Sequence, residues 1–257
     1  STRKESSAAS DVYKRQTIIN NPKIVGVSLT GSEAAGAEVA SIAGKNVKPS
    51  VLELGGSDPM IVLNDADIEK VMSGTINGRL RNAGQACTSS KRIIVQEGIY
   101  DEYLKKITDY VNGMKVGDPT QADTNMGPVS SESALEKLLD QINDSANKGA
   151  TIVSGGKRID REGFFLQPTI LTDLKPGMKA YDEEVFGPVV CIWKVKDVEE
   201  AIKIANDTPY GLGASIYTED VPNAEKIARR IDSGMVYVNK QVSSSPDLPF
   251  GLSLIHI

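Results

Sequence analysis

Apolar and polar residues alternate with two different periods along most of this chain. Short, nearly continuous apolar runs are typical of buried strands, and they predict strands over residues 24–29, 51–54, 60–63, 92–96, 150–153, 165–171, 189–193, 214–217 and 235–239. Longer segments with apolar residues three and four positions apart predict helices over residues 33–43, 65–80, 100–114, 132–148, 197–205 and 223–231. Because strands alternate with helices, we expect an α/β fold with a mainly parallel sheet flanked by helices.

The composition narrows the class of protein. The chain has 257 residues, 40% hydrophobic and 25% charged, which is the balance of a globular protein with one large domain or two smaller ones. Its net charge of −5 argues against a nucleic-acid-binding domain. The sequence also lacks an apolar run of the roughly 18 residues that predict a membrane span. With only two cysteines there is no disulfide framework, so we expect a reducing compartment, the cytoplasm.

Histidine is almost absent, and this limits the available chemistry. The one histidine, His256, is the second-last residue of the chain. A Ser-His-Asp triad therefore lacks a suitable base, and neither a histidine-rich nor an all-cysteine zinc site can be built, so we expect no metal site. Any catalysis must use carboxylates, a thiol, Lys, Arg and backbone amides.

The two cysteines lie in very different sequence surroundings. Cys191 stands among Val189, Val190 and Trp193, which is typical of a small buried residue. Cys87 lies in a polar, glycine-containing loop over residues 82–90, where a nucleophile is often presented. A thiol is the strongest nucleophile that this composition offers. Taken alone, the loop leaves two roles open for Cys87, nucleophile and buried small residue.

Glu53 is a carboxylate at the end of an apolar strand, directly before Leu54, Gly55 and Gly56. Burial would raise its pKa toward the range that a general base needs. A strand-end glutamate that faces water fits the same pattern.

Two further segments have features of a nucleotide site. Residues 31–36, Gly-Ser-Glu-Ala-Ala-Gly, follow a predicted strand and open a predicted helix, where free N–H groups suit a phosphate. The acids Glu183 and Glu184 precede Val-Phe-Gly-Pro and can accept hydrogen bonds from a ribose or face solvent. Each signal is weak alone, because strand–turn–helix units with glycine are common.

Taken together and in this order, these segments resemble the aldehyde dehydrogenase superfamily. The resemblance extends over about residues 23–251 and is carried by Thr30-Gly31-Ser32, Glu53-Leu54-Gly55-Gly56, Gly84-Gln85-Ala86-Cys87, Glu184-Val185-Phe186-Gly187-Pro188 and Pro249-Phe250-Gly251. It implies that Cys87 is the nucleophile that attacks the aldehyde carbon and that its backbone N–H stabilises the resulting oxyanion. It also implies that Glu53 is the general base that activates water to hydrolyse the thioester.

The resemblance implies a nicotinamide cofactor, NAD or NADP, because the family transfers a hydride to it. Gly31 and Ser32 match the turn beside the pyrophosphate, and Gly36 matches the position of close helix packing behind it. Glu184 matches the ribose ligand, Phe186 packs by the nicotinamide, and Leu54 and Gly55 would line its pocket.

Within the superfamily the chain looks most like the succinate-semialdehyde dehydrogenases. Arg81, six residues before Cys87, matches the arginine that pairs with the distal carboxylate of the substrate in those enzymes. Arg79 can share that role. Either arginine can instead interact with the negative end of the preceding helix. An alternative substrate is another small anionic aldehyde.

The chain departs from the family pattern at both ends. We interpret residues 1–16 as a non-native or disordered leader, 17–55 as the C-terminal remnant of a Rossmann-like cofactor domain, 56–251 as the catalytic domain and 252–257 as a tail foreign to the family. On this interpretation the chain is a fragment of a parent that forms a homodimer or homotetramer. We expect the isolated fragment to be nearly inactive, or to act only as a structural domain.

Overall fold

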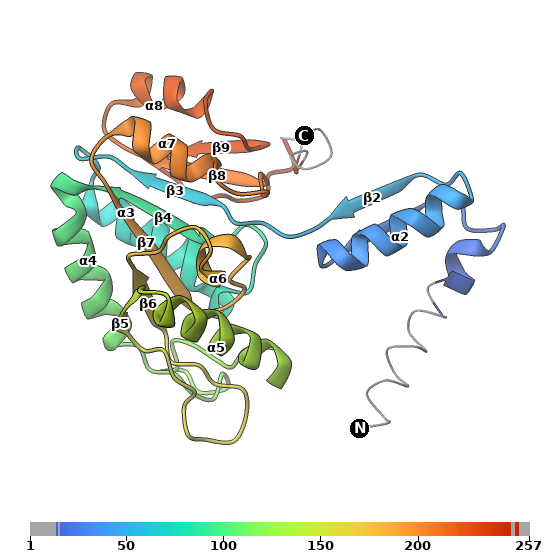
Figure 1. The fold of residues 1–257 in the computed structure, drawn as a ribbon, viewed down its shortest axis with the longest axis horizontal. Helices are drawn as coiled ribbons and strands as arrows, with labels where there is room; N and C mark the ends of the chain where they lie inside the picture. The colour runs from blue at the N-terminus through green and yellow to red at the C-terminus, as the bar shows by residue number, and fades with distance from the viewer. Residues whose placement is uncertain (1–13, 15, 248–249, 252–257) are drawn as a thin grey trace. The chain divides into compact units, whose positions relative to one another are not determined.

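The computed structural model describes residues 14, 16–247, 250 and 251, and the chain divides into two compact units between Gly55 and Gly56. The N-terminal unit contains strand β1 (Val27–Thr30), helix α2 (Glu33–Lys45) and strand β2 (Ser50–Glu53). Strands β1 and β2 pair in parallel, and α2 lies alongside them (Figure 1). The predicted leader lies almost entirely outside the described residues, as does the whole predicted tail, and both stay predictions.

The larger C-terminal unit is built on a seven-stranded sheet in the order β5-β6-β7-β4-β3-β8-β9. All neighbouring strands in this sheet are parallel except β5, which is antiparallel to β6. The strands are β3 (Pro59–Val62), β4 (Arg92–Gln96), β5 (Thr151–Ser154), β6 (Thr169–Thr172), β7 (Val189–Val195), β8 (Gly213–Tyr217) and β9 (Met235–Val238). The expectation of a mainly parallel α/β fold is therefore confirmed.

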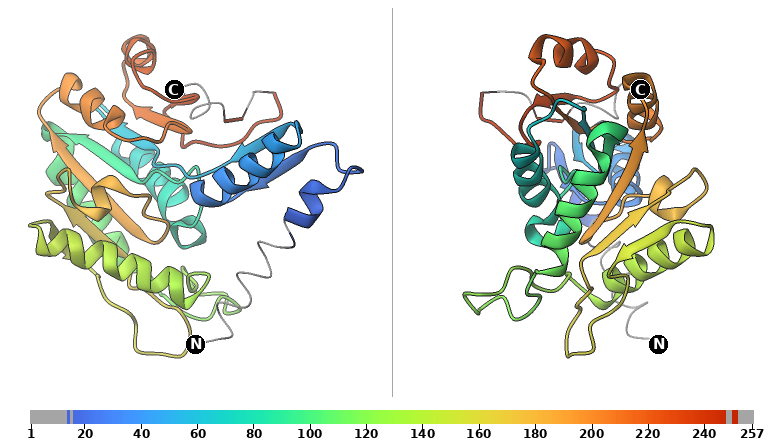
Figure 2. Two further views of the ribbon diagram at one scale, coloured as in Figure 1. Left: turned by 45° about the vertical axis from the view of Figure 1, so that its right-hand side comes forward. Right: turned by 90° about the vertical axis from the view of Figure 1, so that its left-hand side faces the viewer.

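Helices cover both faces of this sheet, so its central strands are buried on both sides. Figure 2 (right) shows α3 and α4 on one face and α5 and α7 on the other. The helices are α3 (Ile68–Thr75), α4 (Glu97–Asn112), α5 (Glu132–Asn147), α6 (Lys179–Asp182), α7 (Val198–Asn206) and α8 (Val221–Ala228). This double cover explains why β3, β4 and β7 are nearly continuous apolar runs rather than alternating ones.

The helix predicted over residues 65–80 differs most from the structure. It begins at Ile68 because Asp67 is the N-cap, and its carboxylate accepts a hydrogen bond from the Glu69 N–H at 2.9 Å. Asp65 instead accepts from the Thr218 hydroxyl at 2.6 Å, beyond strand β8. After Thr75 the chain continues as a π-helix (Ile76–Leu80) and a short 3₁₀ turn (Arg81–Gly84).

The strand predicted over residues 165–171 is also wrong in its first part. Pairing with β7 begins only at Thr169, because Pro168 has no N–H to donate to a neighbouring strand. The four-residue helix α6 was not predicted, since a single turn has too few residues to show a helical period.

Candidate active site

The candidate site lies where three parallel strands begin. Gly56 precedes β3, Cys87 precedes β4 and Glu184 precedes β7. These strands are neighbours in the order β7-β4-β3 and are parallel, so their amino ends lie along one edge of the sheet. This arrangement brings together segments that are far apart in the sequence: the Gly56 N–H donates to Glu184 Oε1 at 3.2 Å.

The loop that carries Cys87 begins with an unusual backbone turn at residues 82–84. Asn82, Ala83 and Gly84 have φ values of 53°, 52° and 70°, in the left-handed region. Such conformations cost free energy for residues other than glycine, and here hydrogen bonds restrain them. The Asn82 side chain donates to the Gln85 carbonyl at 3.0 Å, and the Gln85 side chain donates back to the Asn82 carbonyl at 3.1 Å. The turn therefore presents Cys87 from a restrained backbone.

Two of the sequence motifs pack directly against each other. A Cβ atom on Gly84 would lie 2.1 Å from the carbonyl oxygen of Gly187, so only glycine allows the two backbones to approach this closely. Gly84 belongs to the cysteine loop and Gly187 to the segment that follows Glu184. The structure thus joins the cysteine motif to the Glu-Val-Phe-Gly-Pro motif.

Arg79 lies fully buried beneath this junction, and this corrects one expectation. Its guanidinium donates to the carbonyls of Val189 (2.7 Å), Val185 (2.9 Å) and Gly84 (3.3 Å) and to the Ser89 hydroxyl (2.8 Å). Desolvation lowers the pKa of this guanidinium to about 10. Because its donors are occupied inside the protein, Arg79 cannot bind a substrate carboxylate, and the sequence-based suggestion that it shares that role is wrong.

Lys91 and Glu184 form a second buried charge cluster beside Cys87. The Lys91 ammonium lies 3.1 Å from Glu184 Oε1, and the exposed fractions of the two side chains are 1% and 18%. It also donates to the carbonyls of Ala86 at 2.7 Å and Cys87 at 2.9 Å. Desolvation lowers the pKa of Lys91, while the carboxylates of Glu184 and Asp58 oppose that shift.

Phe186 completes this cluster on its outer side. Its ring is 41% exposed, and its centroid lies 5.7 Å from the Lys91 ammonium nitrogen. Phe186 and Glu184 therefore present an aromatic face and a carboxylate in one place, next to the cysteine loop.

The structure separates the two cysteines as their surroundings predicted. Cys191 is fully buried, and desolvation raises the pKa of its thiol to about 11. Cys87 is only partly buried. Since the thiolate is the reactive form, Cys191 is unsuited to act as a nucleophile.

Arg81 borders an open pocket next to the cysteine loop. The pocket has a volume of about 790 Å³, and it is lined by Asn77, Gly78, Arg81, Asn82, Ala86, Thr88, Gln241, Val242, Ser243 and Ser244. Arg81 is the one charged residue in this lining, and its side chain is exposed. A pocket of about 450 Å³ elsewhere contains none of the predicted site residues in its lining.

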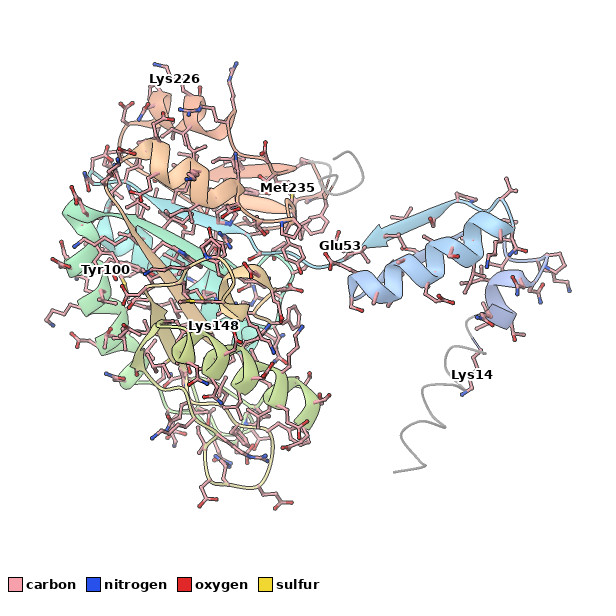
Figure 3. All side chains as sticks on the ribbon, viewed as in Figure 1. Lys14, Glu53, Tyr100, Lys148, Lys226 and Met235 are labelled. Carbon is pink, nitrogen blue, oxygen red and sulfur yellow. The ribbon has the colours of Figure 1, made fainter. Side chains whose placement is uncertain are left out.

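The remaining predicted residues belong to the N-terminal unit. Ser32 caps α2, and its hydroxyl accepts from the Ala35 N–H at 3.3 Å, while the Gly31 N–H donates to the Glu53 carbonyl at 2.9 Å. Glu53, labelled in Figure 3, lies at the end of strand β2. It is partly buried, as are Leu54 and Gly55. The pairing of Glu53 with Cys87 crosses the boundary between the two units and stays a prediction.

The sequence reasoning missed Lys91 and misjudged Arg79. A signal for both was present, because each is a charged residue close to apolar strand or helix positions, where burial is costly without partners. The full set of partners could not be predicted, since the Val185 and Val189 carbonyls that meet Arg79 and the Glu184 carboxylate that meets Lys91 belong to a distant segment.

Two classes of site are absent from the part of the chain that the structure describes. It contains no group of three or more His, Cys, Asp or Glu residues that could hold a metal ion. Within the same residues, none of the helices has the length and apolar character needed to cross a membrane.

Comparison with known proteins identifies the family of the chain. A sequence model described as the aldehyde dehydrogenase family matches residues 10–251. The chain is 47% identical to succinate-semialdehyde dehydrogenase (NADP+) of Deinococcus radiodurans, over 92% of this chain and 50% of that protein. It is 43% identical to succinate-semialdehyde dehydrogenase (NADP+) 1 of Mycobacterium bovis, over 92% of this chain and 52% of that protein.

A solved structure shows the same similarity in three dimensions. The succinic semialdehyde dehydrogenase of Streptococcus pyogenes in complex with NADP+ superposes with a TM-score of 0.90 at 43% identity, over 94% of this chain and 53% of that one. The chain spans about half the length of the curated relatives that it matches. On the family match and these identities, the chain belongs to the aldehyde dehydrogenase family.

Proposed function

We propose that this chain carries the nucleophile and substrate-binding residues of an NAD(P)-dependent dehydrogenase that oxidises succinate semialdehyde to the acid. The observation that carries the proposal is the cysteine loop. It combines a partly buried thiol, a restrained backbone and an adjacent pocket in which Arg81 is the one charged lining residue. Both curated relatives described above are named for this activity.

Covalent catalysis by Cys87 is the central chemical step of this proposal. The Cys87 thiolate attacks the aldehyde carbon, a C–S bond forms and the carbonyl oxygen becomes an oxyanion. The backbone N–H of Cys87 donates to that oxygen. Loss of hydride from the same carbon leaves a thioester on Cys87. Glu53 then takes a proton from water, and the resulting hydroxide attacks the thioester, releasing the acid and the thiolate.

The residues next to the cysteine loop fit a nicotinamide cofactor, NAD or NADP. Glu184 presents a partly exposed carboxylate that can accept hydrogen bonds from ribose hydroxyls, and Phe186 presents an exposed ring beside it. In the N-terminal unit, the amino end of α2 at Gly31 and Ser32 suits a phosphate, with Leu54 and Gly55 following Glu53. When bound, the cofactor would accept the hydride.

Arg81 is proposed to select the substrate. A guanidinium binds a carboxylate through charge-assisted hydrogen bonds, so an exposed arginine in the lining of this pocket favours an aldehyde with an acidic tail. The serines at positions 243 and 244 add hydroxyl groups to the same lining. Succinate semialdehyde fits this chemistry, and another short anionic aldehyde is the second candidate.

The substitution Arg81→Met tests the substrate assignment. We expect kcat/KM for succinate semialdehyde to fall about 10–100-fold, the worth of a hydrogen bond to a charged group, while kcat/KM for butanal changes little. The matched control is Arg229→Met, at the exposed C-cap of α8. The rates are measured with this chain, or within the longer protein where turnover of the chain is too slow. An equal loss for both aldehydes would contradict the role of Arg81, and a preference for glutarate semialdehyde would identify the second candidate.

A further inference from the structure

The Lys91 ammonium makes three close contacts, which matches its three N–H donors. They go to Ala86 O at 2.7 Å, Cys87 O at 2.9 Å and Glu184 Oε1 at 3.1 Å. A longer contact reaches the Ser89 carbonyl at 3.5 Å. The side chain is 1% exposed, so water does not compete for these donors. Lys91 therefore connects the backbone on both sides of Cys87 to a fixed carboxylate.

These contacts determine how the Cys87 backbone is oriented. In a planar trans peptide the C=O of Ala86 and the N–H of Cys87 lie in one plane and point in opposite directions. Holding the Ala86 oxygen on Lys91 therefore directs the Cys87 N–H to the other side of the chain. The same ammonium holds the Cys87 carbonyl, so the two peptide planes that flank the Cys87 Cα are both restrained.

Neighbouring groups hold the cluster in place. The Gly56 N–H shares Glu184 Oε1 with Lys91. The Gly56 backbone also packs against the Cys87 carbonyl so closely that a Cβ atom there would lie 2.6 Å from that oxygen. The charged groups that act on Lys91 are the carboxylates of Glu184 and Asp58, which favour its charged form, and the guanidinium of Arg79, which opposes it.

We propose that Lys91 is a positioning residue for the oxyanion-binding N–H of Cys87. It acts through the peptide planes on either side of Cys87 and does not contact the substrate. The inference rests on the proposed function, because it assumes that Cys87 is the nucleophile. This role of Lys91 is distinct from activation of the thiol. Lys91 controls the direction of the Cys87 N–H and not the ionisation of the Cys87 thiol.

Two reactions of Cys87 separate these possibilities in the chain as it stands. Iodoacetamide alkylates a thiolate by displacement of iodide, and no oxyanion forms. p-Nitrophenyl acetate acylates the thiolate through a tetrahedral oxyanion, after which the C–O bond breaks and p-nitrophenolate leaves. For Lys91→Met we expect acylation to slow about 100-fold or more, the effect of losing one oxyanion donor, and alkylation to change less than about threefold.

Two control variants and a further variant of Lys91 accompany this measurement. Lys105→Met removes an exposed lysine whose partner is Asp109 and should change neither reaction. Arg92→Met removes a buried cation that donates to the Tyr181 and Ile204 carbonyls, away from the cysteine loop, and should leave the ratio of the two rates unchanged. Lys91→Gln retains N–H donors without the charge, so we expect it to slow acylation less than Lys91→Met does; if Lys91→Met does not fold, Lys91→Leu, which removes the donors, replaces it.

Each outcome decides the inference. A selective loss of acylation supports it. An equal loss of both reactions would show that Lys91 acts on the thiolate and would overturn it, as would unchanged rates for both. Absence of any reaction at Cys87 in the unsubstituted chain would overturn the proposed function, and this inference with it.

Discussion

The two units of this chain differ sharply in how much core they contain. In the C-terminal unit, β3, β4 and β7 are buried almost throughout and belong to one large apolar cluster. In the N-terminal unit, the described core consists of Ile19, Val39, Ile42 and Ala43. Its exposed apolar residues include Val47 and Val51, which are 92% and 67% exposed. The free energy of folding that comes from apolar burial is therefore concentrated in the C-terminal unit.

This difference matters for the site because buried charges need a rigid surrounding. Lys91 and Arg79 remain buried because the large unit supplies them with carbonyls and a carboxylate at fixed positions. In the small unit, Lys48 also donates to carbonyls, those of Ile19 and Asn21, but its side chain is only partly buried. Buried cations are thus held by fixed partners in the large unit, while the described core of the small unit is too small to enclose such a cluster.

The largest expected difference between the units is in the loss of unfolding free energy when one apolar side chain in each unit is truncated. Ile94→Ala in β4 removes a fully buried side chain and should lower the free energy of unfolding by about 2–5 kcal/mol. Val51→Ala in β2 removes a side chain that is 67% exposed and should cost less than about 0.5 kcal/mol. Urea unfolding of the whole chain measures both. Similar losses for the two variants would show that the units contribute equally to stability.

The pH dependence of the unfolding free energy offers a second comparison, because the buried thiol of Cys191 lies in the large unit and both cysteines of the chain belong to that unit. Burial raises the pKa of Cys191 from 9.0 to about 11, so the folded chain keeps this proton at pH values where the unfolded chain loses it. The associated stability is complete below pH 9 and is lost as the pH rises through about 11, amounting to about 3 kcal/mol.

Cys191→Ala provides the reference for this measurement. The difference in unfolding free energy between the unsubstituted chain and this variant should decrease steadily as the pH rises from 9 toward 11. A difference that stays constant over that range would contradict the raised pKa of Cys191.

A third comparison substitutes one glycine in each unit. Gly84→Ala places a side chain at a φ of 70° and against the Gly187 backbone, so it should destabilise the chain by about 2 kcal/mol. Gly36→Ala lies within α2 and meets the end of the flexible Leu54 side chain at 2.5 Å. The gain in helix propensity, about 1 kcal/mol, should largely offset that contact. Thermal unfolding distinguishes the two, and a larger loss for Gly36→Ala would reverse this ranking.

Much of the fold was predictable because its signals are local. The apolar runs of β3, β4 and β7 predicted buried strands within one or two residues at most ends. The end of the helix that precedes Cys87 was not predictable, because nothing in residues 65–80 signals a change from α to π geometry. In that π-helix the Gly78 carbonyl accepts from the Ser90 N–H, which belongs to a segment beyond the loop.

The candidate site shows the same division between local and distant determinants. Cys87, Glu53, Arg81 and Glu184 could be named as candidates from their motifs and the family resemblance, and the burial of Cys191 was predicted from its apolar neighbours. The meeting of Gly56, Cys87 and Glu184 required the order of the parallel strands, since it depends on which strands begin side by side. The surroundings of Arg79 likewise depend on carbonyls up to 110 residues away, and those of Lys91 depend on the carboxylate of Glu184. The local sequence pattern determines which side chains could take part in a site. The packing of the parallel strands determines which of those side chains lie next to one another, because it joins segments that are distant in the sequence.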